Sequence, residues 1–140
     1  MIKTITIIGD CPGVKKVAWL LERHGEFNLK PRNMVQQKIE EYLDSRSIQY
    51  VFKNPVYIAK KNRFFFVDYF VPGYNVLIDI RPVLSSEYFD AVKEKERRRC
   101  MKSLKSKYRY QVIDFDDIIK KRYITKLDRQ FDSVYNIYKL

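Results

Sequence analysis

Two carboxylates and one cation stand inside an otherwise largely apolar stretch, residues 64–81. They are Asp68, Asp79 and Arg81, and the Pro-Gly pair at 72–73 predicts a turn that joins two strands. Charges are costly inside a pair of strands, so they need a chemical reason there. Because carboxylate oxygens bind divalent cations, the stretch predicts a metal shared by Asp68 and Asp79. Arg81 would lie beside whatever the metal holds.

The register of this hairpin decides whether the two carboxylates meet, because side chains alternate between the faces of a strand. A turn centred on residues 72–73 places Asp68 opposite Leu77 and Asp79 opposite Phe66. The carboxylates are then diagonal neighbours on one face, with Cβ atoms about 7–8 Å apart or less. This distance allows both to reach one metal ion.

Composition narrows the classes of function. The chain has 140 residues, of which 46% are hydrophobic and 15% aromatic, as expected for one folded domain. Cys11 and Cys100 are isolated, and His24 is the only histidine, which argues against a zinc site of His/Cys type and against a Ser-His-Asp or Cys-His apparatus. The 28 Lys and Arg against 17 Asp and Glu give a net charge of +11, which favours a polyanionic partner such as nucleic acid.

The positive charge is concentrated in residues 93–109, which contain nine basic and two acidic residues. Two interpretations are open for this segment: a solvated helix face, or a helix whose side chains contact phosphates. On the second interpretation the phosphate-contacting residues are Lys93, Arg97, Arg98, Arg99, Lys102 and Lys105. A smaller basic cluster follows at 120–126.

Apolar periodicity and breaking residues predict a mixed α/β domain with a central sheet. The expected units are a strand-helix appendage over 1–32 and a core with C-terminal helices over 33–140. The expected elements are a strand in 1–10, a helix over 13–24, a linker over 27–32, a helix over 33–47 capped by Asn33, a strand over 48–58, the hairpin 64–81, a helix over 87–105, a strand over 110–115, and helices near 116–122 and 126–138.

An acidic group lies just after the last expected strand and consists of Asp114, Asp116 and Asp117. It allows a second metal site, but a helix N-cap formed by Asp116 is the simpler expectation.

The pattern Asp68-(x10)-Asp79-x-Arg81 follows a helix that ends Leu43-Asp-Ser-Arg-Ser-Ile48, and precedes a basic helix and a strand. This arrangement resembles the PD-(D/E)xK nuclease superfamily. It is most similar to the small branch that contains the very-short-patch mismatch endonucleases and a phage Holliday-junction resolvase. The resemblance covers roughly residues 33–118 and implies a restriction-endonuclease-like core, with a central mixed sheet flanked by helices.

Carried over by position, Asp68 and Asp79 match the two strand carboxylates of the family, and Arg81 falls where many members have the catalytic lysine. The resemblance implies Mg²⁺ or Mn²⁺ held by these two aspartates and the main-chain carbonyl of Ile80. Because an arginine keeps its proton, Arg81 would clamp the phosphate and not act as a base.

The helix residues of the family site are only partly matched. Gln36 stands where the family often has a glutamate, and Glu40 follows one turn later, so either could complete the metal site. Lys93 or Lys95 could replace the missing lysine, as helix-borne lysines do in some relatives.

The residues and the resemblance together predict a metal-dependent endonuclease that hydrolyses phosphodiester bonds of DNA, on structured or phage DNA. The alternative is a catalytically inactive nucleic-acid-binding protein on a nuclease scaffold. No signal peptide or membrane span is visible, so we expect the cytoplasm, or the host cytoplasm for a phage protein. Resolvases of this type act as dimers, which makes a homodimer compatible, and residues 1–32 could dock another protein.

Overall fold

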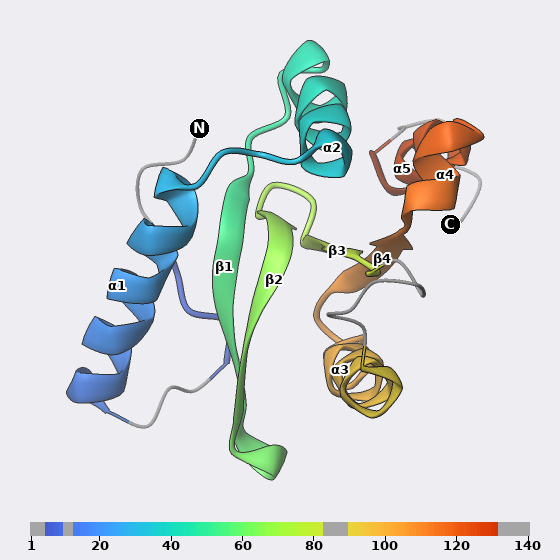
Figure 1. Cartoon of the computed structure of the whole chain (residues 1–140). Helices are drawn as coiled ribbons and strands as arrows, with labels where there is room; N and C mark the ends of the chain where they lie inside the picture. The colour runs from blue at the N-terminus through green and yellow to red at the C-terminus, as the bar shows by residue number, and fades with distance from the viewer. Residues whose placement is uncertain (1–4, 10–12, 83–89, 132–140) are drawn as a thin grey trace.

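The computed structural model describes residues 5–9, 13–82 and 90–131. It is an α/β fold in which helices flank a four-stranded mixed sheet, as the sequence predicts (Figure 1). The elements are α1 (Val14–Leu29), α2 (Met34–Ser45), β1 (Val51–Ile58), the short 3₁₀ helix η1 (Ala59–Lys61), β2 (Arg63–Val71), β3 (Val76–Ile80), α3 (Ala91–Lys102), β4 (Arg109–Ile113), α4 (Phe115–Ile119) and α5 (Arg122–Phe131).

The strands lie in the order β1-β2-β3-β4. The pairs β1–β2 and β2–β3 are antiparallel, whereas β3 and β4 are parallel. A parallel pair needs a crossover connection, and the connection between β3 and β4 contains α3. The basic helix is therefore held against the strand that carries Asp79.

Apolar side chains form one cluster on each face of the sheet. On one face, Ile39 of α2 and Leu127 of α5 pack with Ile78 of β3. On the other face, Met101 of α3 packs with Leu77 of β3. Figure 1 shows α2, α4 and α5 on one side of β3 and β4 and α3 on the other. The sheet is thus covered on both faces.

The alternation of side chains breaks at one position of β1 and β2. Val67 packs in the cluster under α3 and Tyr69 in the cluster under α2, although strand residues two apart normally share a face. In β1, Lys53 has a left-handed φ of 53°, uncommon for a residue with a side chain. The irregularity therefore coincides with Asp68, which lies between Val67 and Tyr69.

The register predicted for the hairpin is wrong by two residues. The strands pair up to a four-residue loop, 72–75, instead of a turn centred on the Pro-Gly pair. The loop continues past the Pro-Gly pair to Asn75, because Asn75 adopts a left-handed φ of 52°, which asparagine tolerates better than most residues. As a result Phe70, and not Asp68, pairs with Leu77.

The N-terminal elements differ partly from the prediction. Helix α1 continues to Leu29, through the predicted linker, because a single glycine such as Gly25 weakens a helix without ending it. Within 5–9, only an isolated bridge from Ile8 to Val56 represents the predicted strand. Gly9 approaches β1 so closely that a Cβ there would lie 2.1 Å from the Tyr57 carbonyl oxygen.

The helix over 33–47 is confirmed as α2, where Asn33 and Gln36 form a capping box. The helix after the hairpin begins at Ala91 with Asp90 as its N-cap, and the first residues predicted for it, 87–89, lie outside the described residues.

The C-terminal helices also begin elsewhere than predicted. Asp114, and not Asp116, caps α4, since the Asp114 side chain accepts the main-chain N–H of Asp117. The two predicted helices correspond to α4 and α5, and the part of the second beyond residue 131 lies outside the described residues.

Candidate functional site

The Asp79 carboxylate is the centre of a buried polar cluster and is 0% exposed. Arg97 donates to both of its oxygens, from Nη2 to Oδ1 at 2.7 Å and from Nε to Oδ2 at 2.9 Å. Arg98 Nη1 and the Tyr110 hydroxyl donate to Oδ2 at 2.8 and 2.7 Å. A bidentate arginine pair is among the strongest side-chain interactions, so Asp79 is held firmly between β3, β4 and α3.

Asp68 lies next to Asp79 on the neighbouring strand and is also buried. Its Oδ1 accepts Lys53 Nζ at 2.6 Å, and its Oδ2 accepts the main-chain N–H of Ile80 at 2.7 Å. The main-chain N–H of Asp68 donates in turn to Asp79 Oδ1 at 3.2 Å. The structure therefore brings the two aspartates together, although through a register that differs from the prediction.

Two residues of the basic helix turn into the protein. Arg97 also donates to the carbonyl oxygen of Phe66 at 2.8 Å, and Arg98 Nε donates to Glu94 at 2.6 Å. The sequence places both arginines among the phosphate-contacting residues, but the structure uses their guanidinium groups to neutralise Asp79. Met101, which is buried, lies four residues after Arg97 and three residues after Arg98, so all three side chains are on the side of α3 that faces the sheet.

The two carboxyl groups differ in their electrostatics. Burial acts to raise the pKa of Asp79, but the charge and hydrogen bonds of Arg97, with Tyr110 and Arg98, outweigh it and hold the pKa well below its usual range. Burial and the negative charge of Asp79 raise the pKa of Asp68, against the opposing effects of Lys53 and Arg97. Asp79 is thus the fixed anion of the pair, and Asp68 is the one that is harder to ionise.

Arg81 lies at the end of β3 and its side chain is 47% exposed. Its Nε is 3.8 Å from Glu94 Oε1, the oxygen that Arg98 also contacts. Its main-chain N–H donates to the carbonyl oxygen of Ile113. The Arg81 guanidinium therefore lies near Glu94 of α3, and its one ion pair is with that residue in the described structure.

The two helix residues proposed as further metal ligands lie elsewhere. The Gln36 side chain accepts the main-chain N–H of Asn33 at 2.9 Å, so it completes the cap of α2. Glu40 accepts the hydroxyl groups of Tyr69 and Tyr50 at 2.7 and 3.1 Å and pairs with Arg32 at 2.7 Å. Neither side chain reaches the aspartate pair in this arrangement.

As placed, these residues do not fit Mg²⁺ or Mn²⁺. Both oxygens of each aspartate already accept hydrogen bonds, and three cations, Lys53, Arg97 and Arg98, surround them. Among the described residues, no group of three or more acidic, His or Cys side chains could hold a metal ion. Mg²⁺ requires several oxygen ligands in near-octahedral geometry, whereas here each carboxylate oxygen already has a hydrogen-bond donor beside it.

Sequence reasoning missed two members of the cluster. Lys53 lies in β1, fifteen residues before Asp68, and Tyr110 lies in β4. The only local signal was the spacing of Arg97, Arg98 and Met101, which puts the two arginines on the side of α3 that also carries an apolar residue.

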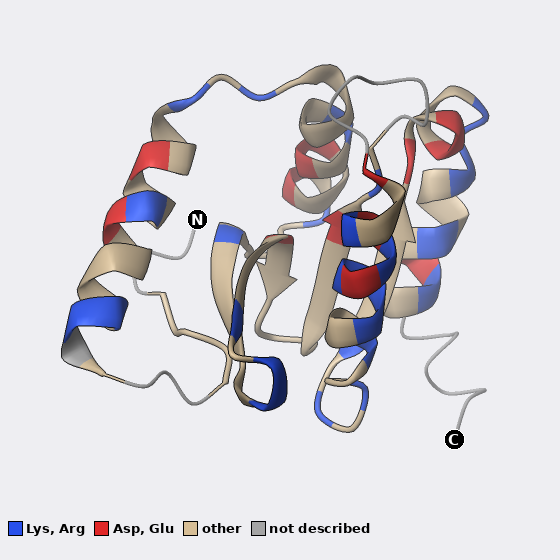
Figure 2. Ribbon diagram, turned by 60° about the horizontal axis from the view of Figure 1, so that its bottom comes forward, with Lys and Arg blue, Asp and Glu red and all other residues tan. Residues whose placement is uncertain are grey.

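Five exposed basic residues make up what we call the outer face of α3, and within the described residues none makes an ion pair with a carboxylate. Lys95, Arg99 and Lys102 lie on one side of the helix, Lys93 lies near its N-terminal end, and Lys105 lies in the turn after it. Figure 2 shows Lys and Arg along α3, in the loop that follows it and at the turn between β1 and β2.

The second basic cluster is neutralised instead. Buried Asp117 accepts Arg122 and Lys126 at 3.1 and 2.8 Å, and Asp116 pairs with Arg122 and Lys120. These contacts lower the pKa of Asp117 against the opposing effect of its burial. The aspartates thus bind neighbouring cations, and Asp114 serves as a helix cap.

No family model matches the chain, and no curated protein or solved structure matches it either. In the part of the chain that the structure describes, no helix has the length and apolar character needed to cross a membrane.

Proposed function

We propose that this protein binds nucleic acid through the outer face of α3 and that the cluster around Asp79 is a structural element. The observation that carries the proposal is a difference in ion pairing between the cations around Asp79 and those on the outer face of α3. The arginines around Asp79 are neutralised by a buried carboxylate, whereas the outer face of α3 has no ion pair among the described residues. Exposed, unneutralised lysines and arginines along one helix attract a polyanion.

The net charge of +11 supports the same proposal, since the basic residues around 120–126 are largely paired and the excess is concentrated elsewhere. Contacts from lysine and arginine to phosphates release counterions and give binding without reading bases. We therefore expect affinity with little dependence on sequence, and DNA is the first partner to test.

The order of elements supports a restriction-endonuclease-like core as the scaffold. The succession α2, β1, β2, β3, α3, β4, with a meander of three antiparallel strands followed by a parallel fourth, agrees with the core implied by the resemblance. In this proposal the scaffold keeps its carboxylate pair, but arginine and lysine side chains occupy the positions around it.

The test is equilibrium binding of fluorescein-labelled DNA, followed by anisotropy between about 50 and 200 mM salt. Five or so phosphate contacts predict that affinity falls by roughly two to three orders of magnitude over this range. Affinity that is absent at 50 mM salt, or that does not change with salt, would contradict the proposal.

Metal-dependent DNA hydrolysis is the second candidate. The observation that favours it is the position of Asp68 and Asp79 on neighbouring strands, where the main-chain N–H of Asp68 donates to the Asp79 carboxylate and that of Ile80 donates to the Asp68 carboxylate. It requires that Lys53 and Arg97 leave the two carboxylates, because these cations occupy the oxygens that a metal would bind.

A cleavage assay separates the two candidates. Supercoiled, linear and branched DNA would be incubated with Mg²⁺ or Mn²⁺, beside an Asp79→Ala variant and a chelator. Cutting that disappears with the chelator, and in an Asp79→Ala variant that circular dichroism shows to be folded, would establish the enzyme. Absence of cutting together with salt-sensitive binding would leave nucleic-acid binding as the function.

A further inference from the structure

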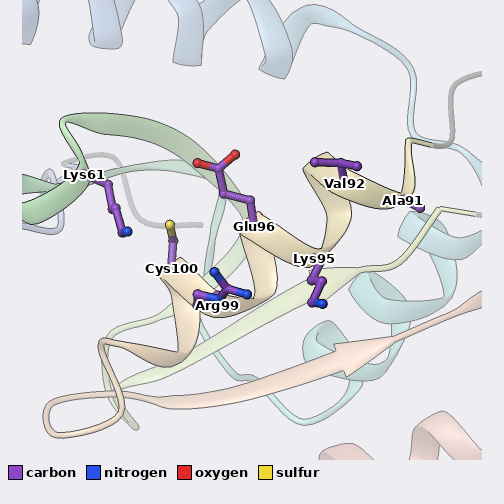
Figure 3. Close-up of a pocket in the computed structure, with 7 residues that line it drawn as sticks. All are labelled: Lys61, Ala91, Val92, Lys95, Glu96, Arg99 and Cys100. Atoms are coloured by element: carbon purple, nitrogen blue, oxygen red, sulfur yellow. The ribbon is translucent and has the colours of Figure 1, made fainter.

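A groove lies between α3 and the turn that joins β1 to β2. Its volume is about 540 Å³, and its lining residues are Lys61, Ala91, Val92, Lys95, Glu96, Arg99 and Cys100. Figure 3 shows Lys61 on the turn, across the groove from the α3 side chains, which follow one another along the helix. The groove is therefore open along α3 and has a wall on each side.

Three cations line this groove without a carboxylate of their own. Lys61, Lys95 and Arg99 are exposed, and the structure shows no ion pair for them within the described residues. The one acidic residue of the lining, Glu96, is 3.2 Å from Arg63 Nε and is thus already paired. Three like charges around one cavity repel one another, and a bound anion would relieve that repulsion.

We propose that this groove binds backbone phosphates of one nucleic-acid strand and that Lys61, Lys95 and Arg99 are their ligands. The inference rests on the proposed function and gives it a location. Lys95 and Arg99 are one helical turn apart, about 6 Å along the axis of α3, so they present two cations in a row. Lys61 supplies the third from the opposite wall.

The chemistry of the lining suits phosphates. The planar guanidinium of Arg99 matches a phosphate with two parallel hydrogen bonds, and the lysines add point charges. The lining also includes small or apolar side chains, Ala91 and Val92 before Lys95 and Cys100 after Arg99, against which sugars can lie. A groove of about 540 Å³ is in the size range of a site for one small ligand, so it accommodates a short part of one strand and not the full width of a duplex.

The groove is separate from the buried cluster. Lys95 and Arg99 lie on the outer face of α3, whereas Arg97 and Arg98 reach Asp79 on the inner side. Substitutions in the groove therefore remove phosphate ligands and leave the ion pairs of Asp79 in place.

The experiment compares two triple variants that each lose three positive charges. The groove variant carries Lys61→Gln, Lys95→Gln and Arg99→Gln. The matched control carries substitutions of exposed lysines on α1, on α2 and before α5, namely Lys15→Gln, Lys38→Gln and Lys121→Gln. Anisotropy of fluorescein-labelled single-stranded and duplex DNA would be measured over a salt series, after thermal unfolding has shown that both variants are folded.

We expect the groove variant to bind single-stranded DNA at least tenfold more weakly, and the slope of log affinity against log salt to fall in magnitude by about 2. The control variant should lose less than about threefold. Equal losses in the two variants would overturn the groove while the proposed function stands. Wild-type protein that binds neither DNA would overturn both.

Competition identifies the ligand class. Excess inorganic phosphate should displace DNA only weakly, because the groove engages several phosphates of one strand together. Polyglutamate that competes as well as unlabelled DNA of the same charge, and loses this ability in the groove variant, would overturn the assignment to a nucleic-acid backbone.

Discussion

Both the inner and the outer side of α3 carry basic side chains, but those on the inner side are ion-paired and those on the outer side are not, among the described residues. Arg97 and Arg98 are largely buried and both bind Asp79, and Arg98 also binds Glu94, whereas Arg99, the next residue, is exposed and lines the groove. Successive residues of a helix point about 100° apart, so one step along the chain separates a structural arginine from one available to a ligand. Charge alone therefore does not assign function, because the partner of each cation decides it.

The two sides also differ in energetics. A buried ion pair has lost its hydration, so removal of one partner leaves an uncompensated charge in the interior. An exposed cation stays hydrated, and its removal changes the folded state little but weakens the attraction for an anion. Substitutions on the inner side should thus change stability, and those on the outer side should change binding.

The largest effect should come from Asp79→Asn. The variant keeps the shape of the side chain but leaves Arg97 without its anion and Arg98 with Glu94 alone, which should lower the free energy of unfolding by about 3–5 kcal/mol. Urea denaturation followed by circular dichroism would measure this loss. Asp116→Asn is the matched control, since Asp116 is exposed, and a comparable loss in both variants would show that Asp79 has no special role.

A direct test of this comparison substitutes one arginine on each side of α3, in two separate variants. Arg99→Gln should weaken DNA binding several-fold and reduce the salt slope by about 0.7–0.9, the value for one phosphate contact, with stability nearly unchanged. Arg97→Gln should lower stability and keep the salt slope of the folded protein. Titrations and melting curves of both variants give the result. Loss of the salt slope in Arg97→Gln alone would reverse our assignment of the two sides.

The pH dependence of stability should distinguish the aspartates. The pKa of Asp79 is lowered on folding, so its ionised form stabilises the protein above the unfolded pKa of about 3.9, and this stabilisation is lost as the pH falls through and below that value. Asp68, whose pKa is raised, acts in the opposite direction, since its ionisation above about pH 4 costs stability.

We therefore expect the difference in unfolding free energy between the wild type and Asp79→Asn to shrink from pH 6 to pH 3. Urea denaturation at several pH values would measure it. A difference that stays constant across this range would mean that Asp79 does not have a lowered pKa.

The smallest effect should come from the second basic cluster. Lys126→Gln removes a cation that is already paired with Asp117, so DNA affinity should change by less than about twofold. The same titration as for Arg99→Gln measures it. A loss as large as that of Arg99→Gln would show that paired cations also contact the nucleic acid.

Much of the local structure follows from neighbouring residues and could be predicted. Asn33 caps α2 as expected, and the apolar stretch 64–81 forms a hairpin that brings Asp68 and Asp79 together. Both depend on interactions within a few residues, such as a side chain that caps the next helical turn. The α/β class also followed, because the order of helices and strands is visible in the periodicity.

Features that depend on distant segments were not predictable. The inward side of α3 depends on what the helix packs against. The hairpin register was missed for a local reason, the left-handed conformation of Asn75 in the loop. Helix α3 has few apolar residues, so no strong stripe marked its buried side beforehand. Lys53 reaches Asp68 because β1 is irregular there, which no local pattern announces.

By itself, the sequence determined the class of fold, the pair of aspartates on adjacent strands and the excess of positive charge. Only the tertiary structure decided which cations neutralise that pair and which remain exposed. The physical reason is that water solvates an exposed ionisable side chain, so it needs no partner, whereas a buried carboxylate must be matched by cations that packing brings to it. Here α3 brings two arginines to Asp79 and leaves the third, Arg99, in the groove.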